Sequence, residues 1–311
     1  MNAYKSLIKN IRILGLATGC LYSLLSLIDR GFYKYSNNIS NRAYNYKNRI
    51  VHNYISYIDS LCNGENIEKQ ETSNKIWVFW WQGIDEAPLV IKQCINSIKD
   101  HTPGREVVVI SKGNISDYLK LPNYIMSKVG HTITFTHFSD IVRLKLVSQY
   151  GGGWIDAGLF LTDDLPDYIS EFEYFTIKNT HTADRIITNF RWTNGFMFAK
   201  NSCVLTQRLS MILMKYWELN DYQLEYFLLD YIEDYLYDSD NECKKLVDGV
   251  PITNNRTFID GLFERWNLPF NEKEWKEITK DTWCHRLSYK TKYTNSTTSF
   301  YNVVVNQRYK I

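Results

Sequence analysis

Apolar runs of strand length alternate with helical patterns between residues 75 and 161, and this alternation constrains the fold more than any other feature of the chain. "KIWVFWW" (75–81) and "REVVVIS" (105–111) are typical of buried strands. Pro88 opens the helix between them, and "HTITFT" (131–136) predicts a further strand. Such an alternation predicts an α/β fold with a mainly parallel sheet and helices on both faces. Ligands of these sheets bind beyond the carboxyl ends of the strands.

The next segment carries charged side chains toward that edge of the sheet. A helix is predicted over residues 140–150, with Asp140 and Arg143 three residues apart on one face. Taken alone, this pair is also consistent with a surface ion pair, which would contribute little to stability. The strand predicted over 154–162 then delivers Asp156. Asp140, Arg143 and Asp156 are therefore candidates to meet at one site.

The second half of the chain continues the pattern. Two strands (171–179 and 191–200) and two helices (203–217 and 221–237) are predicted there. On the second helix, Asp230, Glu233 and Asp234 are expected on a solvated face rather than at an acceptor site.

Composition and charge narrow the class of protein. The chain has 311 residues, of which 44% are hydrophobic and 23% charged, so it should be globular. The six cysteines show no CxxC pair and no metal-ligand spacing, which favours a reduced compartment. The net charge of +2 is uneven, because basic residues gather at both ends and the middle is acidic. This distribution disfavours nucleic acid as a partner and favours an anionic membrane surface.

The amino-terminal region reads as helical. "ILGLATGCLYSLLSLI" (13–28) is uncharged, but at about 1.5 Å per residue it falls short of the roughly 30 Å hydrocarbon core. A helix lying on the membrane surface, a helix packed on the core and a true span all remain open. An amphipathic helix (41–61) and a linker (62–74) follow. We therefore expect an N-terminal helical region over 1–74 and a second domain over 75–311.

Three stretches carry a family resemblance: "KIWVFWWQGIDEAP", "HFSDIVRLKLVSQYGGGWIDAGLFL" and "HRLSYK". Over residues 75–290 the chain resembles bacterial capsular polysaccharide synthesis proteins, relatives of the DXD-type sugar transferases of the glycosyltransferase family 32-like group. The resemblance implies a GT-A type fold with a mostly parallel central sheet, preceded here by the N-terminal helices. It also implies a nucleotide-sugar donor, with a UDP-sugar favoured, and transfer to a hydroxyl with retention of configuration.

The same resemblance assigns the site residues. Asp140, Arg143 and Asp156 are the implied catalytic residues. The implied donor-binding residues are Trp80, Trp81, Gln82, Gly83, Asp140, Arg143, Gly152, Gly153, Asp156, Asn194, Arg286 and Lys290. From the residues alone, Trp80 is as well explained as a core aromatic, and Asn194 as part of a tight turn. The glycine run 151–153 removes side chains where something approaches the backbone closely.

A metal ion is an open question in this site. Asp156 matches the first DXD carboxylate, but the second position is Gly158, so the chain departs from the metal-binding form. Asp156 and His285 are the candidates to hold Mn²⁺ or Mg²⁺. The alternative is that Arg286 and Lys290 neutralise the diphosphate without a metal.

Two classes of function follow. The leading hypothesis is a membrane-associated glycosyltransferase of capsule or surface-glycan synthesis, acting on a lipid-linked saccharide at the cytoplasmic face. Gly158 motivates the alternative of a catalytically degenerate subunit that binds sugar nucleotide or glycan. A sugar-phosphate transferase is a weaker third hypothesis.

Overall fold

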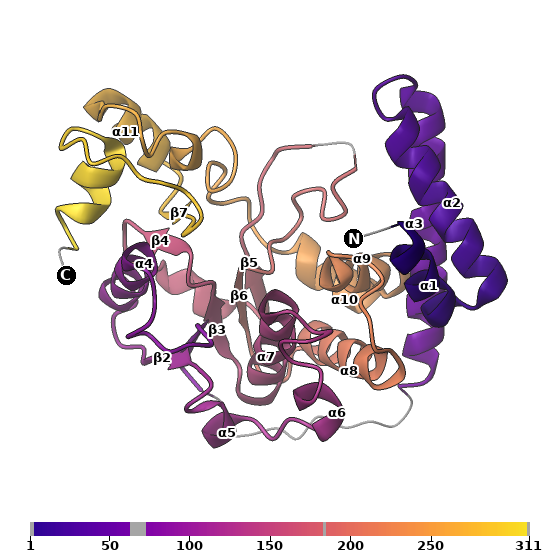
Figure 1. The fold of residues 1–311 in the computed structure, drawn as a ribbon. Coiled ribbons are helices and arrows are strands. Elements are labelled where there is room, and N and C mark those ends of the chain that lie inside the picture. The colour runs from indigo at the N-terminus through magenta and orange to yellow at the C-terminus, as the bar shows by residue number, and fades with distance from the viewer. Residues whose placement is uncertain (1–2, 63–72, 183–184, 310–311) are drawn as a thin grey trace.

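The computed structural model describes residues 3–62, 73–182 and 185–309, and its centre is a five-stranded sheet (Figure 1). The strands are β1 (Ile76–Phe79), β2 (Val107–Ile110), β3 (Gly152–Ile155), β5 (Tyr174–Thr176) and β6 (Phe196–Ala199). Their order is β2-β1-β3-β6-β5. β1 pairs parallel with β2 and β3, whereas β6 pairs antiparallel with β3 and β5. Within this sheet only β6 opposes the common direction, so the mostly parallel α/β sheet is confirmed.

Helices surround the sheet in the alternating order that the sequence predicts. They are α4 (Leu89–Asp100), α5 (Ile115–Tyr118), α6 (Asn123–Met126), α7 (Phe135–Tyr150), α8 (Val204–Leu219), α9 (Leu228–Ser239), α10 (Asn241–Asp248) and α11 (Glu272–Thr279). α7 packs against β1, β3, β6 and α8, so it lies across the middle of the sheet. Trp77, Trp154 and Trp217 are among the largest fully buried side chains of the core.

The strand predicted over residues 131–136 is wrong. Only an isolated bridge joins Val129 to Ile133, and α7 already begins at Phe135. Thr134 is the N-cap of α7, with its side chain accepting the backbone N–H of His137. Capping by a threonine hydroxyl therefore outweighs the β propensity of this segment. Both edges of β1 are also occupied, by β2 and β3.

The strand predicted over 154–162 is two strands. β3 ends at Ile155, and β4 (Leu159–Leu161) pairs with β7 (Cys284–Arg286) in a separate two-stranded sheet. Asp156 lies at the break, directly beyond the carboxyl end of β3. The chain leaves the central sheet at this point, which places the carboxylate where α/β sheets bind their ligands.

The amino-terminal region forms three helices at one edge of the molecule (Figure 1): α1 (Ala3–Leu14), α2 (Leu16–Phe32) and α3 (Asn37–Ser60). The apolar run 13–28 is not one helix, because Gly15 takes a φ of 80° between α1 and α2. In the described part of the chain, no helix is both long and apolar enough to cross a membrane. α3 packs on α8 and α9 and buries Val51, Ile55 and Ile58, as its apolar spacing predicts.

Candidate active site

Arg143 joins two carboxylates that come from different elements. From α7, its Nη1 lies 3.0 Å from Oδ1 of Asp140, and its Nη2 lies 3.0 Å from Oδ1 of Asp156. The guanidinium also lies 5.0 Å from the ring of Trp154, and the Arg143 side chain is only 4% exposed. A shielded arginine that binds two carboxylates holds them in a fixed relation. The structure therefore excludes the alternative of a surface ion pair.

Asp156 is held on one side and open on the other. Its Oδ1 accepts a second hydrogen bond, from Trp154 Nε1 at 2.7 Å, while the side chain as a whole is 45% exposed. Its backbone N–H donates to the carbonyl of Gly195 at 2.8 Å. A Cβ on residue 195 would lie 2.9 Å from Oδ2 of Asp156, so a glycine is needed beside the carboxylate. Asn194-Gly195 thus has a packing role next to the site.

A third carboxylate, Asp230 on α9, belongs to the same centre. Its Oδ1 accepts hydrogen bonds from Asn194 Nδ2 at 2.8 Å and Trp192 Nε1 at 3.2 Å. Burial raises the pKa of Asp230 to about 6. Burial also raises the pKa of Asp140 to about 7, aided by the charges of Asp230 and Asp156 and opposed by Arg143. We call Asp140, Arg143, Asp156, Asn194 and Asp230 the acidic centre.

Glu233 lies one turn further along α9, and its expected place on a solvated face is wrong. The side chain is fully buried, and its Oε1 accepts a hydrogen bond from the Tyr174 hydroxyl at 2.8 Å. Burial raises the pKa of Glu233 to about 8, and the charge of Asp230 adds to that rise. Below that pH, a protonated Glu233 lies one turn from Asp230 and adds no further negative charge beside the acidic centre.

The pH dependence of stability tests this assignment. Between the ordinary Glu pKa of 4.5 and about 8, native Glu233 holds a proton that the unfolded chain has lost, so stability falls as pH rises through this window. Glu233→Gln cannot lose that proton. We expect its loss of unfolding free energy between pH 5 and pH 8, measured by urea unfolding, to be smaller than that of the wild type by roughly 1–3 kcal/mol. The exposed control Glu171→Gln should follow the wild type, and an unchanged slope in Glu233→Gln would contradict the assignment.

The two tryptophans that follow β1 have different neighbours, and only Trp80 is shown to contact the closing "HRLSYK" segment. Trp80 meets Tyr289 edge to face with ring centroids 5.5 Å apart, and its Nε1 is buried without a hydrogen-bond partner. Trp81 instead stacks on Phe135 at 5.7 Å. Gln82 is exposed, and Gly83 takes a φ of 89° in the turn. Trp80 is thus the residue of this group with an unsatisfied polar atom, whereas Trp81 packs against the start of α7.

The closing segment packs against Gly158, which stands at the second DXD position. The backbone N–H of Leu287 donates to the carbonyl of Gly158 at 2.8 Å, and a Cβ on residue 158 would lie 3.0 Å from the Leu287 carbonyl. Arg286 is exposed, with its guanidinium 5.6 Å from the ring of Phe258. Lys290 is also exposed and lies 5.7 Å from the ring of Tyr289. Backbone pairing therefore explains the glycine at 158.

His285 contacts aromatic rings and a threonine. The side chain is fully buried, its ring contacts Trp266 and Trp275, and its Nε2 lies 3.3 Å from Oγ1 of Thr162. Burial lowers the pKa of His285 to about 3. The site therefore offers too few protein ligands to coordinate a metal ion by itself, since Asp156 has one open oxygen and Gly158 has no side chain.

Gly152 and Gly153 lie at the start of β3, at the opposite end of the strand from Asp156. Gly152 has a φ of 87°, and a Cβ there would lie 2.4 Å from the carbonyl oxygen of Lys75. A Cβ on Gly153 would lie 2.4 Å from the ring of Phe198. The close approach that the glycine run predicts is thus made by the chain itself, because protein atoms fill the positions that side chains at 152 and 153 would take.

Comparisons with known proteins match the chain to a polysaccharide synthesis family and to two glycosyltransferases. The family model described as "Capsular polysaccharide synthesis protein" matches residues 31–304. The O-glycosyltransferase braB of Annulohypoxylon truncatum is 30% identical over 169 residues, covering 47% of this chain and 38% of that protein. Glycosyltransferase afumC of Aspergillus fumigatus is 28% identical over 107 residues, covering 30% of this chain and 27% of that protein. The chain thus spans well under half the length of these two curated relatives.

A solved structure is also similar. The WbbM bifunctional glycosyltransferase in its apo form aligns with a TM-score of 0.38 and 12% identity, covering 96% of this chain and 69% of that chain.

Proposed function

The chain belongs to the capsular polysaccharide synthesis protein family, and we propose that it is a glycosyltransferase that moves a sugar from a nucleotide-sugar donor to a hydroxyl of a glycan acceptor. The observation that carries this proposal is the Arg143 arrangement. A buried guanidinium fixes Asp140 and Asp156 at the carboxyl end of β3, where α/β sheets bind their ligands. Such pre-organised carboxylates are suited to hold the hydroxyl groups of a donor.

The roles of the residues differ with their exposure. Asp156 has the most open side chain of the three and is proposed to face the donor beside its diphosphate. Asp140, which is 20% exposed, is proposed to contact donor hydroxyls. Arg143 is a positioning residue, because a side chain that is 4% exposed acts mainly through the two carboxylates that it holds. Trp80, with its unpartnered Nε1, is proposed to pack against the donor base.

The leaving diphosphate needs positive charge. We place that charge on Arg286 and Lys290, which are exposed on the segment that crosses Gly158. A divalent ion on the open oxygen of Asp156 is the alternative, and His285 is too enclosed to share it. A UDP-sugar donor, a lipid-linked saccharide acceptor and retention of configuration are further parts of the proposal that rest on the family resemblance.

A donor panel tests this function. The purified full chain is incubated with UDP-, GDP- and CMP-sugars in Mn²⁺, in Mg²⁺ and in chelator, and both hydrolysis and transfer are followed by mass spectrometry of the products. We expect turnover of one donor class that survives in chelator. Turnover only with added metal would shift the diphosphate role from Arg286 and Lys290 to an ion at Asp156. Failure with every donor would favour the non-enzymatic alternative of a sugar-nucleotide or glycan-binding subunit.

We further propose that α2 rests on the cytoplasmic face of an anionic membrane, where a soluble donor and a lipid-linked acceptor meet. Leu21, Leu24 and Leu27 form a stripe along α2 and are 49%, 54% and 56% exposed. Arg12, in the last turn of α1, and Arg30, in the last turn of α2, are also exposed. Apolar side chains flanked by cations suit the surface of an anionic bilayer.

Vesicle binding tests the membrane proposal. The double variant Leu24→Ser/Leu27→Ser is expected to weaken cosedimentation with phosphatidylglycerol vesicles by at least about tenfold, because two apolar side chains no longer enter the lipid. The matched control Leu89→Ser/Leu219→Ser changes two leucines of similar exposure on α4 and α8. Equal binding by the two double variants would reject α2 as the membrane contact.

A further inference from the structure

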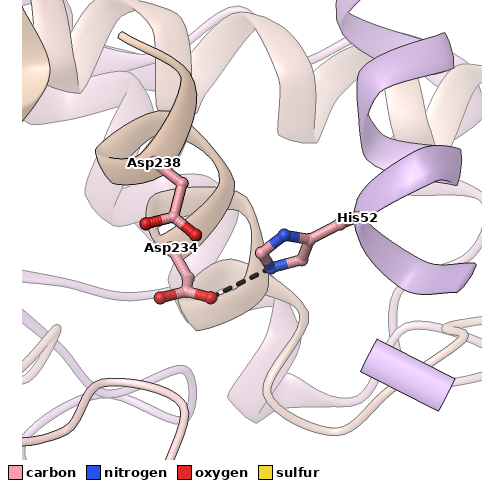
Figure 2. A group of neighbouring side chains, drawn as sticks. All are labelled: His52, Asp234 and Asp238. Carbon is pink, nitrogen blue, oxygen red and sulfur yellow. Dashed lines mark ion pairs between the residues drawn. The ribbon is translucent and has the colours of Figure 1, made fainter. Parts of the chain in front are cut away.

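A second cluster of ionisable side chains lies between the N-terminal helix α3 and α9. His52 projects from α3 toward Asp234 and Asp238, which lie one turn apart on α9 (Figure 2). One ligand atom from each of the three residues lies within 4.8 Å of the other two. Among the residues that the structure describes, this is the single group of three or more potential metal ligands with such spacing.

The contacts inside the cluster leave the imidazole incompletely satisfied. Nε2 of His52 lies 2.9 Å from Oδ2 of Asp234, but it is shielded from solvent and has no partner in hydrogen-bond geometry. The rings of Tyr231 and Tyr235 meet the imidazole edge to face, each with centroids 6.4 Å apart, and fix its orientation. A well-oriented nitrogen thus faces a carboxylate without bonding it well.

The two carboxylate oxygens of Asp234 have different partners. Its Oδ1 pairs with Nη2 of Arg191, whereas Oδ2 is the oxygen that faces His52. Asp238 is exposed and lies four residues further along α9, on the same helical face. One nitrogen and two carboxylate oxygens therefore converge from two helices, with a solvent side from which an ion can enter.

The geometry points to a divalent metal site of the zinc type, formed by His52, Asp234 and Asp238 with water as the remaining ligand. Imidazole and carboxylate together suit Zn²⁺, whose tetrahedral ligands at about 2.0–2.1 Å lie roughly 3.3 Å from one another. The three ligand atoms lie within 4.8 Å of one another, so binding requires them to approach by up to about 1.5 Å. The ion would link α3 to α9 and so stabilise the attachment of the N-terminal helices to the rest of the protein.

This site is separate from the donor site. Asp234 lies one turn from Asp230 on α9, but it is bound by Arg191 and not by Arg143. We expect moderate affinity, because Arg191 already neutralises part of the Asp234 charge. The metal is structural here, so its loss should lower thermal stability whether or not the protein has transferase activity.

Zinc binding by the full chain tests the site. After treatment with chelator and dialysis, the protein is titrated with Zn²⁺ by calorimetry, and its melting temperature is measured with and without the ion. We expect one bound ion and a Zn²⁺-dependent rise in Tm. Asp238→Asn should weaken the affinity by at least about tenfold, and His52→Gln should weaken it further, since each removes a direct ligand. The exposed control Glu242→Gln, on α10, should bind like the wild type.

The outcomes separate a built site from adventitious binding. No binding by the wild type, or equal affinity in all the variants, would overturn the proposal. Asp238 is exposed, so Asp238→Asn should fold normally and keep the test decisive if His52→Gln does not fold. Loss of the same ion in Asp156→Asn would place it in the acidic centre and would also overturn the proposal.

Discussion

Arg143→Met is expected to lower the free energy of unfolding by about 3–5 kcal/mol and to abolish transfer. The variant keeps most of the side-chain volume but removes the cation that Asp140 and Asp156 share. Loss of one partner from a buried ion pair leaves an uncompensated charge in a poorly solvated place, and this strongly destabilises the folded state. Asp140 is most affected, because burial and the charges of Asp156 and Asp230 already raise its pKa to about 7. Urea unfolding at pH 8, where Asp140 ionises, measures the effect most directly.

Arg256→Met is the matched control for this experiment. Arg256 pairs with Glu277 at 3.4 Å, but the two side chains are 32% and 63% exposed. Exposed pairs contribute roughly 0–1 kcal/mol, so this variant should remain close to the wild type. The two variants make the same chemical change at a buried and at an exposed pair. If they lose similar amounts of unfolding free energy, Arg143 is not the structural centre of the site.

The sequence predicts the central residues of the site because they lie on consecutive elements. Asp140 and Arg143 share one helical face, and Asp156 follows the next strand. Arg143 and Asp156 are only 13 residues apart, so alternation of helix and strand brings them together at one edge of the sheet. The mostly parallel sheet is predictable for the same reason, since its buried strands read as continuous apolar runs.

Other parts of the site depend on contacts that no local pattern reveals. Asp230 reaches the acidic centre through Asn194, 36 residues away, and its helix reads as amphipathic with an acidic face. Tyr174 on β5 and Trp192 lie against Glu233 and Asp230, and for this reason Glu233 is buried instead of solvated. His285 resembles a family motif, yet the rings of Trp266 and Trp275 enclose it. In each case the pairing of distant segments, rather than the residue type, decides the environment.

Asp156→Asn is expected to reduce turnover by about 10²–10³-fold while donor binding is retained. Asparagine keeps the shape of the side chain, and its oxygen can still accept from Trp154 Nε1, which lies 2.7 Å from Oδ1 in the wild type. The variant loses the negative charge on a side chain that is 45% exposed, so its unfolding free energy should fall by no more than about 1–2 kcal/mol. A large loss of rate with a small loss of stability is typical of a group that acts on the reacting substrate.

Asp163→Asn is the control, because Asp163 is an exposed carboxylate on the same chain segment and lies outside the acidic centre. Turnover and donor affinity are measured for the wild type and both variants with the donor that the panel identifies. Wild-type turnover together with a slow, donor-binding Asp156→Asn would make the protein an enzyme despite the glycine at 158. Wild-type protein that binds donor without turnover, and loses no function in Asp156→Asn, would identify a binding subunit. The comparison of the wild type with Asp156→Asn, and not the absence of a carboxylate at position 158, therefore distinguishes an enzyme from a binding subunit.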